Sequence, residues 1–448
     1  MKKEKYINRR EFFKISGIAA TTTTAALYGC SKLKKSSGSI GDVSTNMMTY
    51  RTFPSLGDTI SILGYGCMRW PTIPNPEGRG EIIDQETVNE LIDYAIEHGV
   101  NYFDTAPVYV MGQSERATGI ALKRHPREKF FIATKMSNFM NSDFDASVAM
   151  YKNSFKQLQV DYLDYYLLHV LSSEEEIDKR FINNGLLDFL LKEREAGRIR
   201  HLGWSFHGTF EGFDYALALH DKVHWDFVQI QFNYSDWKSD LDAKYLYDEL
   251  TKRNIPVVVM EPLLGGRLSN LPVHIVSRLK EQNPESSAAS WAFRYAASFD
   301  GVFTVLSGMT YMEHLQDNVK TYSPLVPLNE EQKEFLYETA ELMRQYPTIP
   351  CNNCDYCMPC PYGIDIPGVL VHYNKCVNDG NIPKSSEDEN YRKARRAFLV
   401  SYDRSIEKVR QAAHCIGCKQ CIKLCPQKID IPTELRKIDN FIEQLKQA

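Results

Sequence analysis

The chain lacks the features that mark membrane-spanning and nucleic-acid-binding proteins. Its formal net charge is -4 over 448 residues, so electrostatics gives no reason to expect nucleic acid or an anionic membrane as a partner. After residue 30, no apolar run is long enough to cross a bilayer. The hydrophobic share of 43% and the charged share of 25% are ordinary for a globular protein with one large and one small domain.

Cysteine is scarce along most of the chain and is concentrated in two runs near the C-terminus. The first run comprises Cys351, Cys354, Cys357 and Cys360, and the second comprises Cys415, Cys418, Cys421 and Cys425. The second run has the spacing C-x2-C-x2-C-x3-C-P of bacterial ferredoxins, and the first is one residue shorter before its last cysteine. The spacing therefore predicts two 4Fe-4S clusters and single-electron chemistry.

Other uses of these cysteines fit the spacing less well. Structural zinc sites bring two C-x2-C pairs together over a longer spacer, and such tight spacing strains most disulfide pairings. In two-cluster ferredoxins the fourth cysteine of each run binds the other cluster. The sequence leaves open whether Cys360 and Cys425 are exchanged in this way. Cys376, between the runs, is expected to pack rather than ligate.

The N-terminal 30 residues are interpreted as a twin-arginine export signal. Arg9 and Arg10 precede a mild apolar stretch over residues 15–29, an arrangement typical of that pathway, which carries folded proteins. The alternative is a basic disordered tail. Residues 27–30 resemble a lipoprotein cleavage box, which predicts a lipid anchor at Cys30. Residues 31–47 are predicted to be a flexible tether, and the mature protein is expected in the periplasm or anchored at the cell envelope.

Eight short β-rich segments alternate with amphipathic segments over residues 48–325. Most of them have the continuous apolar character of parallel strands that are buried on both faces. The eight segments are 61–66, 101–105, 130–135, 164–169, 201–206, 227–232, 256–261 and 302–307. This pattern predicts an α/β fold, a (β/α)8 TIM barrel. A doubly wound sheet is the alternative, but Gly64-Tyr65-Gly66 lacks the third glycine of a dinucleotide fingerprint.

The flanks of the predicted barrel have their own patterns. Residues 49–53 and 58–60 are expected to form a hairpin that closes the barrel bottom. Residues 326–350 are predicted to be a helical linker, and residues 351–448 a small, mainly helical 4Fe-4S dicluster domain.

Four ionisable residues lie at or just after the ends of consecutive predicted strands, where barrel enzymes place catalytic groups. They are Asp104, Tyr109, Lys135 and His169. This set suits reduction of a carbonyl by hydride, with Tyr109 as the general acid. Lys135 beside the phenol is expected to lower its pKa, Asp104 to pair with Lys135, and His169 to place the carbonyl through a hydrogen bond.

The same motifs resemble the aldo-keto reductase superfamily. The resemblance is carried by Asn101-Tyr-Phe-Asp104-Thr-Ala-Pro-Val-Tyr109, Ala133-Thr-Lys135 and Leu167-Leu-His169. The whole chain resembles the branch of that family with a fused C-terminal dicluster domain. The resemblance implies that Asp104, Tyr109, Lys135 and His169 are catalytic, and that NAD or NADP binds at the barrel mouth.

The resemblance also implies which segments hold the nicotinamide cofactor. Ser205 and Gln231 would hold the carboxamide, and Met260 stands where the family often has an aromatic residue. Cys67, Met68 and Arg69, after the first strand, are expected at the barrel mouth. The implied cofactor-binding residues are Gly66, Met68, Ser205, Gln231, Met260, Glu261, Leu263, Gly265, Ser307, Gly308, Met309, His314, Asp317 and Asn318.

The predicted adenosine end leaves the nucleotide undecided. Members that prefer NADP usually carry Lys or Arg there, because a 2′-phosphate needs cationic partners. Gly308 and His314 fill those places in this chain, so NAD and NADP both remain open.

Two functions follow from these patterns. The first is a nicotinamide-dependent oxidoreductase that interconverts a small-molecule carbonyl and an alcohol, with two 4Fe-4S clusters relaying electrons to or from a partner. The alternative is an iron–sulfur electron-transfer or binding protein on a catalytically silent barrel. Export would separate the enzyme from free nucleotide, so the cofactor is expected to travel bound and to be recycled in place.

Overall fold

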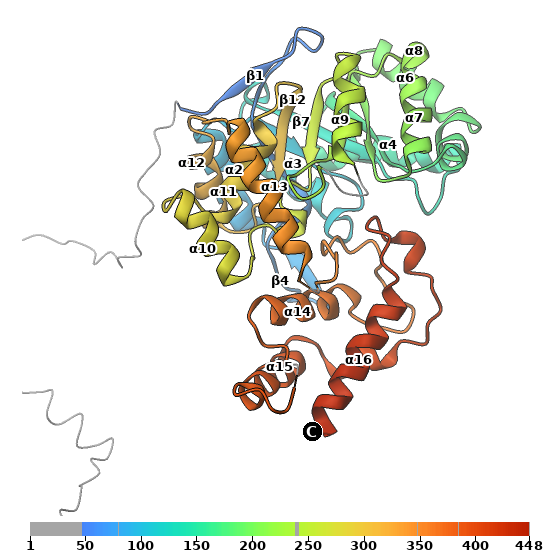
Figure 1. Ribbon diagram of the computed structural model, residues 1–448. Helices are drawn as coiled ribbons and strands as arrows, with labels where there is room; N and C mark the ends of the chain where they lie inside the picture. Colours follow the sequence, from blue (N-terminus) through green and yellow to red (C-terminus); the bar gives the residue numbers. More distant parts are fainter. Residues whose placement is uncertain (1–46, 79, 238–241, 347, 384, 448) are drawn as a thin grey trace, which may run out of the picture. The chain divides into compact units, whose positions relative to one another are not determined.

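Eight parallel strands form a closed barrel with helices on its outside (Figure 1). The computed structural model describes residues 47–78, 80–237, 242–346, 348–383 and 385–447. The predicted export signal, the lipid anchor at Cys30 and most of the predicted tether lie outside the described residues. No helix within the described ranges is long and apolar enough to cross a membrane.

All eight predicted barrel strands are present, in sequence order around the barrel. Hydrogen bonds between β12 and β3 close the ring. The barrel strands are β3 (Leu63–Gly66), β6 (Tyr102–Asp104), β7 (Phe131–Met136), β8 (Leu163–Leu171), β9 (Ile199–Phe206), β10 (Phe227–Gln231), β11 (Val257–Met260) and β12 (Val302–Ser307).

Helices pack outside the strands because their apolar faces are buried against the barrel. In α2, for example, Val88, Leu91, Ile92 and Ala95 are buried at helical spacing. The helices of this layer are α2 (Gln85–Glu97), α3 (Ser114–Leu122), α4 (Phe144–Leu158), α5 (Glu174–Ile177), α6 (Leu186–Glu195), α7 (Phe210–Ala218), α8 (His220–Val223), α9 (Ala243–Lys252), α10 (Val273–Gln282), α11 (Ala288–Ala297) and α12 (Met312–Thr321).

The predicted hairpin closes one end of the barrel. Strands β1 (Tyr50–Thr52) and β2 (Thr59–Ser61) pair antiparallel. Their connection places Phe53 and Leu56 against a cluster of inward-facing barrel residues, and Phe53 meets the ring of Phe303 edge-on at 5.3 Å. The hairpin therefore seals the end of the barrel opposite the carboxyl ends of the strands. A second small hairpin, β4 (Thr72–Pro74) with β5 (Glu81–Ile83), follows β3.

The segment predicted to be a helical linker contains α13 (Glu330–Arg344), which begins with a capping box at Asn329. Its buried residues Leu336 and Ala340 belong to the same apolar core as the barrel helices. The helix therefore packs against the barrel rather than spanning a gap.

The C-terminal residues have an apolar core of their own. It lies between α14 (Ile366–Asn378), α15 (Tyr391–Ser405) and α16 (Ile431–Gln447). The sequence Ile-Asp-Ile-Pro occurs twice, at 364–367 and 429–432, and each copy begins a helix. Asp365 accepts a hydrogen bond from the Gly368 backbone N–H, and Asp430 accepts one from the Thr433 backbone N–H. We call residues 349–447 the cluster domain.

Candidate active site and cysteine clusters

The barrel brings the four predicted catalytic side chains together. Asp104 is the last residue of β6, and Lys135 and His169 lie near the carboxyl ends of β7 and β8. Tyr109 begins a short 3-10 helix after β6. All four line one cavity of about 580 Å³ and are almost completely buried. This site lies at the carboxyl end of the strands, where parallel barrels place their chemistry.

Asp104 and Lys135 form a buried ion pair. The Lys135 ammonium donates to Asp104 Oδ1 and, at 2.9 Å, to the Thr105 carbonyl. Burial raises the pKa of Asp104 and lowers that of Lys135, and the attraction between the two charges opposes both shifts. The ammonium lies 5.0 Å from the centre of the Tyr109 ring, so the pair holds a positive charge beside the phenol.

The expected lowering of the Tyr109 pKa is wrong for this structure. Burial raises the pKa of Tyr109 well above its ordinary value, and the neighbouring Tyr356, Asp104 and Glu261 add to the effect. The main reason is desolvation, which disfavours the charged phenolate at this buried position. The phenol is therefore protonated at neutral pH, which suits a group that gives a proton to a carbonyl oxygen.

His169 is held neutral and fixed in orientation. Burial lowers its pKa well below the usual range, and the Lys135 and Arg180 charges act in the same direction. Its Nδ1 is 2.6 Å from Ser137 Oγ. Arg180 donates to the His169 carbonyl at 2.7 Å and to the Val170 carbonyl at 3.0 Å, so Nε2 is left facing the cavity.

All but two of the predicted cofactor-binding residues line the same cavity. They are Gly66, Met68, Ser205, Met260, Glu261, Leu263, Gly265, Ser307, Gly308, His314, Asp317 and Asn318. Arg69 also lines the cavity, as expected, whereas Cys67 is buried in the core. Burial raises the pKa of Glu261 to about 7, and the Arg69 charge opposes this shift.

Gln231 and Met309 lie outside the cavity lining. Gln231 donates to Asp236 at 2.6 Å and accepts from Gln427 at 3.1 Å. Met309 is buried in the barrel core, and its carbonyl accepts a hydrogen bond from Tyr65. Gln229, two residues earlier in β10, lines the cavity instead, and its Oε1 is buried without a partner among the described atoms. Gln231 is the last residue of β10, and its hydrogen bonds to Asp236 and Gln427 hold its side chain away from the cavity lining.

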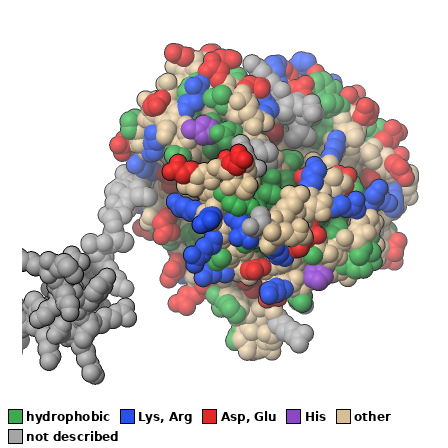
Figure 2. Space-filling view, turned by 60° about the horizontal axis from the view of Figure 1, so that its bottom comes forward, with side chains coloured by type: hydrophobic (Ala, Val, Ile, Leu, Met, Phe, Trp, Pro, Cys, Tyr) green, Lys and Arg blue, Asp and Glu red, His purple; other side chains and the backbone are tan. Residues whose placement is uncertain are grey.

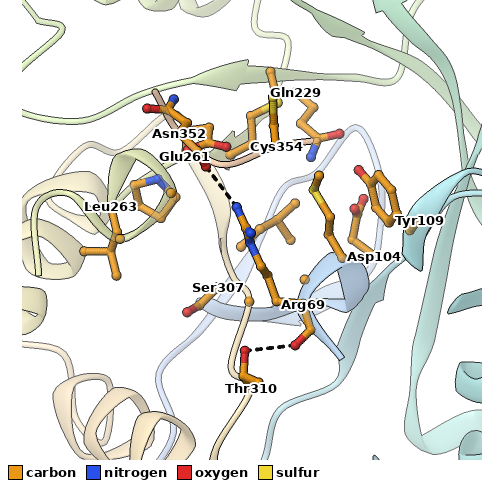
Figure 3. Close-up of a pocket in the computed structure, with 18 of the residues that line it drawn as sticks. Arg69, Asp104, Tyr109, Gln229, Glu261, Leu263, Ser307, Thr310, Asn352 and Cys354 are labelled. Carbon is orange, nitrogen blue, oxygen red and sulfur yellow. Dashed lines mark hydrogen bonds between the residues drawn. The ribbon is translucent and has the colours of Figure 1, made fainter. Parts of the chain in front are cut away.

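The cluster domain completes the wall of this cavity (Figure 3). Arg69 reaches across and donates to the Asn352 carbonyl at 2.9 Å, and Tyr356 Oη lies 3.4 Å from His169 Nε2. Gly265 has φ +64°, and a Cβ there would lie 2.0 Å from the Asn352 carbonyl oxygen, so glycine permits the close approach. Cys354 lines the cavity with Tyr109.

Sequence reasoning missed the cavity residues that the cluster domain supplies: Asn352, Cys354, Tyr356, Pro426 and Gln427. No local pattern indicates them, because their position depends on how the cluster domain packs on the barrel mouth. The only hint is that Tyr356 is an aromatic residue between two predicted ligands. Asn352 is notable because both polar atoms of its buried side chain lack a partner among the described atoms, which suits a bound ligand.

The eight cysteines of the two runs form two groups by electrostatic proximity. Cys351, Cys354 and Cys357 interact with one another and with Cys425. Cys421 interacts with Cys415, Cys418 and Cys360. Each group thus takes three cysteines from one run and the last cysteine from the other. We call Cys351, Cys354, Cys357 and Cys425 the inner group, and Cys360, Cys415, Cys418 and Cys421 the outer group.

The donor chemistry of both groups fits iron–sulfur clusters. All eight are free thiols, and thiolates are the usual ligands of 4Fe-4S clusters. In the described part of the chain, no three His, Cys, Asp or Glu side chains are close enough to hold a single metal ion. The ligands of a cluster bind four different iron atoms and stand further apart. Cys376 is buried in the cluster domain core, where it was expected to pack.

Two family models match the chain. The model of the aldo/keto reductase family matches residues 63–338, and that of a 4Fe-4S dicluster domain matches residues 350–429. The uncharacterized oxidoreductase YqkF of Bacillus subtilis (strain 168) is 25% identical over 291 residues, which cover 58% of this chain and 87% of that protein. L-galactose dehydrogenase of Arabidopsis thaliana is 26% identical over 310 residues, which cover 64% of this chain and 92% of that protein.

A solved structure shares the barrel fold. The holo form of aldo-keto reductase AKR11C1 from Bacillus halodurans matches with a TM-score of 0.54 and 23% identity. The match covers 65% of this chain and 96% of that protein. At this identity the likeness concerns the fold alone.

Proposed function

The chain belongs to the aldo/keto reductase family and is an NAD(P)-dependent oxidoreductase, and from this we propose that it interconverts a carbonyl and an alcohol by hydride transfer. We further propose that two 4Fe-4S clusters relay electrons to or from a partner. One observation carries the combination: Tyr109, the proton donor, and Cys354, a ligand of the inner group, line the same cavity. The chemistry of the barrel and the nearest thiol of the cluster domain are therefore not separated by packed protein.

In the direction of reduction, the side chains donate a proton and stabilise the negative charge that remains on the donor. The nicotinamide supplies the hydride when it is bound. Tyr109 donates its phenolic proton to the carbonyl oxygen as negative charge develops there. The Lys135 charge, held by Asp104, stabilises the phenolate that remains. Neutral His169 places the substrate oxygen by a hydrogen bond from the ring nitrogen that faces the cavity.

The nucleotide is proposed to lie between the ends of β9 to β12 and the cluster domain. Ser205 and Gln229 are placed to hold the carboxamide, and Gln229 replaces the Gln231 of the sequence prediction. The segment at the adenosine end contributes Glu313 and Asp317 to the cavity, but no Lys or Arg. Because carboxylates repel a 2′-phosphate, we expect NAD to bind at least as well as NADP.

The two cysteine groups are proposed to hold one cluster each. A 4Fe-4S cluster stores and passes single electrons, so two clusters match the two electrons of one hydride. The inner group borders the cavity through Cys354, and the outer group is the one further along a path to the surface. We also propose, from the sequence of residues 1–30, that the protein is exported by the twin-arginine route with its cofactors bound, and is periplasmic or lipid-anchored at Cys30.

Replacement of the proton donor tests the hydride chemistry. In Tyr109→Phe, we expect the rate of carbonyl reduction to fall by at least about 100-fold, since general acid catalysis contributes roughly that much. The assay follows NADH and NADPH consumption with aldoses and small aldehydes, a panel chosen because one relative is named L-galactose dehydrogenase. Tyr391→Phe, at the start of α15, is the matched control. Full activity in Tyr109→Phe would refute the assignment of Tyr109 as proton donor. Absence of any NADH- or NADPH-dependent turnover in the unmodified protein would favour the silent barrel.

A further inference from the structure

The two cysteine groups differ in what surrounds them. In the inner group, Cys354 borders the catalytic cavity. In the outer group, Cys418 is exposed, whereas the other seven predicted ligands are partly buried. One end of the relay therefore faces the chemistry, and the other faces solvent.

The surface around Cys418 is basic. Lys408, Lys419 and Lys423 are exposed there, and Glu407 is the only acidic residue in residues 404–428. Two local contacts bring further basic residues toward the second cysteine run: His414 Nε2 lies 3.0 Å from the Lys408 carbonyl, and a Cβ at Gly417 would lie 3.6 Å from Arg436. Arg410 lies 4.0 Å from Asp365, and the exposed Asp403 and Asp430 flank the segment, but Lys and Arg still outnumber Asp and Glu over residues 403–430.

Exposed apolar side chains interrupt this charge. Val409 is 69% exposed, Ile416 is 62% exposed and Leu424 is 49% exposed. Exposed apolar side chains next to charges of mainly one sign are typical of surfaces that dock a transient partner. We call Lys408, Val409, Ile416, Lys419, Lys423 and Leu424, around Cys418, the outer face.

Building on the proposed relay, we infer that the outer face docks a small acidic protein that carries single electrons. Charge complementarity selects an acidic carrier, because opposite potentials steer the encounter and like charges suppress it. Exposure of Cys418 lets the carrier approach a ligand of the outer group directly. A patch of this size suits a brief encounter rather than a lasting complex.

The electron count of this exchange balances. Oxidation of one alcohol to a carbonyl releases two protons and two electrons. Each encounter passes one electron from the protein to one carrier, which is reduced by one electron. Two encounters therefore accept the pair, and the same steps in reverse supply a reduction.

Figure 2 shows Lys and Arg side chains on the face of the molecule that is brought forward. A second set of basic residues, Arg392, Lys393, Arg395 and Arg396, lies in the first two turns of α15. Along the axis of α15, Arg392 lies about 20 Å from Ser405 at 1.5 Å per residue, and the outer face begins only after Ser405. The charges of this second set therefore provide a matched comparison within the same domain.

The test measures electron transfer from the full-length protein, reduced with dithionite and freed of excess reductant, to cytochrome c in a stopped-flow instrument. Native cytochrome c is basic, and succinylation of its lysines makes it acidic, so one haem protein provides both charges. We expect the acidic form to be reduced at least about tenfold faster than the basic form at low salt. The difference should shrink as salt screens the charges.

Charge reversal locates the site. In the double variant Lys419→Glu with Lys423→Glu, the preference should invert, whereas Arg392→Glu with Lys393→Glu should leave it unchanged. Iron content and the spectrum of reduced clusters should match the unmodified protein in both. Preference for the basic cytochrome, or a loss confined to the α15 variant, would overturn the inference. Because dithionite supplies the electrons, the result does not depend on reduction through the barrel, whose failure would refute the proposed function alone.

Discussion

At the scale of single residues, the site is organised by where charges are balanced. Asp104 and Lys135 form a buried ion pair beside the Tyr109 ring, and burial keeps the Tyr109 phenol protonated. The residues were predictable because they end consecutive strands. The direction of the Tyr109 pKa was not, since it depends on burial of the phenol and on neighbours such as Tyr356 that are distant in sequence.

Through Tyr356, the cluster domain contacts His169, one of the four predicted catalytic residues. The Tyr356 hydroxyl lies 3.4 Å from His169 Nε2, and Phe139 packs beside both rings. In Tyr356→Phe we expect the KM for substrate to change about three- to tenfold, which corresponds to one hydrogen bond of about 1 kcal/mol. The kcat should change less, and nucleotide affinity and iron content should stay constant.

The neighbouring variant Asp355→Asn provides the control for that experiment. Asp355 is exposed at φ +63°, a conformation that asparagine tolerates, so the loop keeps its course. If both variants alter KM equally, the effect belongs to the loop and Tyr356 has no positioning role.

At the scale of elements, the strands were predictable because continuous apolar segments alternate with helical ones. The position of α13 was less predictable. Its capping box and helical period are visible in the sequence, but its packing on the barrel core depends on residues distant in sequence. The same holds for Gln229 and Gln231, because the partners of the Gln231 side chain, Asp236 and Gln427, come from outside β10.

The exchange of the fourth cysteines is an element-scale claim with a direct test. Cys425 should behave as a member of the inner group, and Cys360 as a member of the outer group. We therefore expect Cys425→Ser to leave the same residual EPR spectrum as Cys354→Ser, with about half the iron retained. Cys360→Ser should leave the spectrum of Cys418→Ser.

The opposite pairing of these spectra would contradict the exchange. If Cys425→Ser matched Cys418→Ser, each run would hold its own cluster, and the proximity of Cys425 to the first run would be structural only.

At the scale of the whole molecule, the cluster domain lines the same cavity as the four predicted catalytic residues. Besides Arg69 with Asn352 and Tyr356 with His169, it contacts the barrel through Asn378, which donates to the Asn270 carbonyl at 2.8 Å. These contacts lie far apart in sequence, so motifs alone predict two domains but not the cavity they share. Spacing predicted the ligands, and packing determines which of them borders the chemistry.

The most direct test of the shared cavity is anaerobic EPR of the oxidised, full-length protein after addition of NADH or NADPH, with and without a carbonyl or alcohol substrate. The account predicts that a reduced-cluster signal develops in the unmodified protein and in Tyr391→Phe. Comparison of the signals obtained with NADH and NADPH shows which nucleotide the site binds productively. Clusters that dithionite reduces but that no nucleotide or substrate reduces would contradict the proposed connection between barrel and clusters.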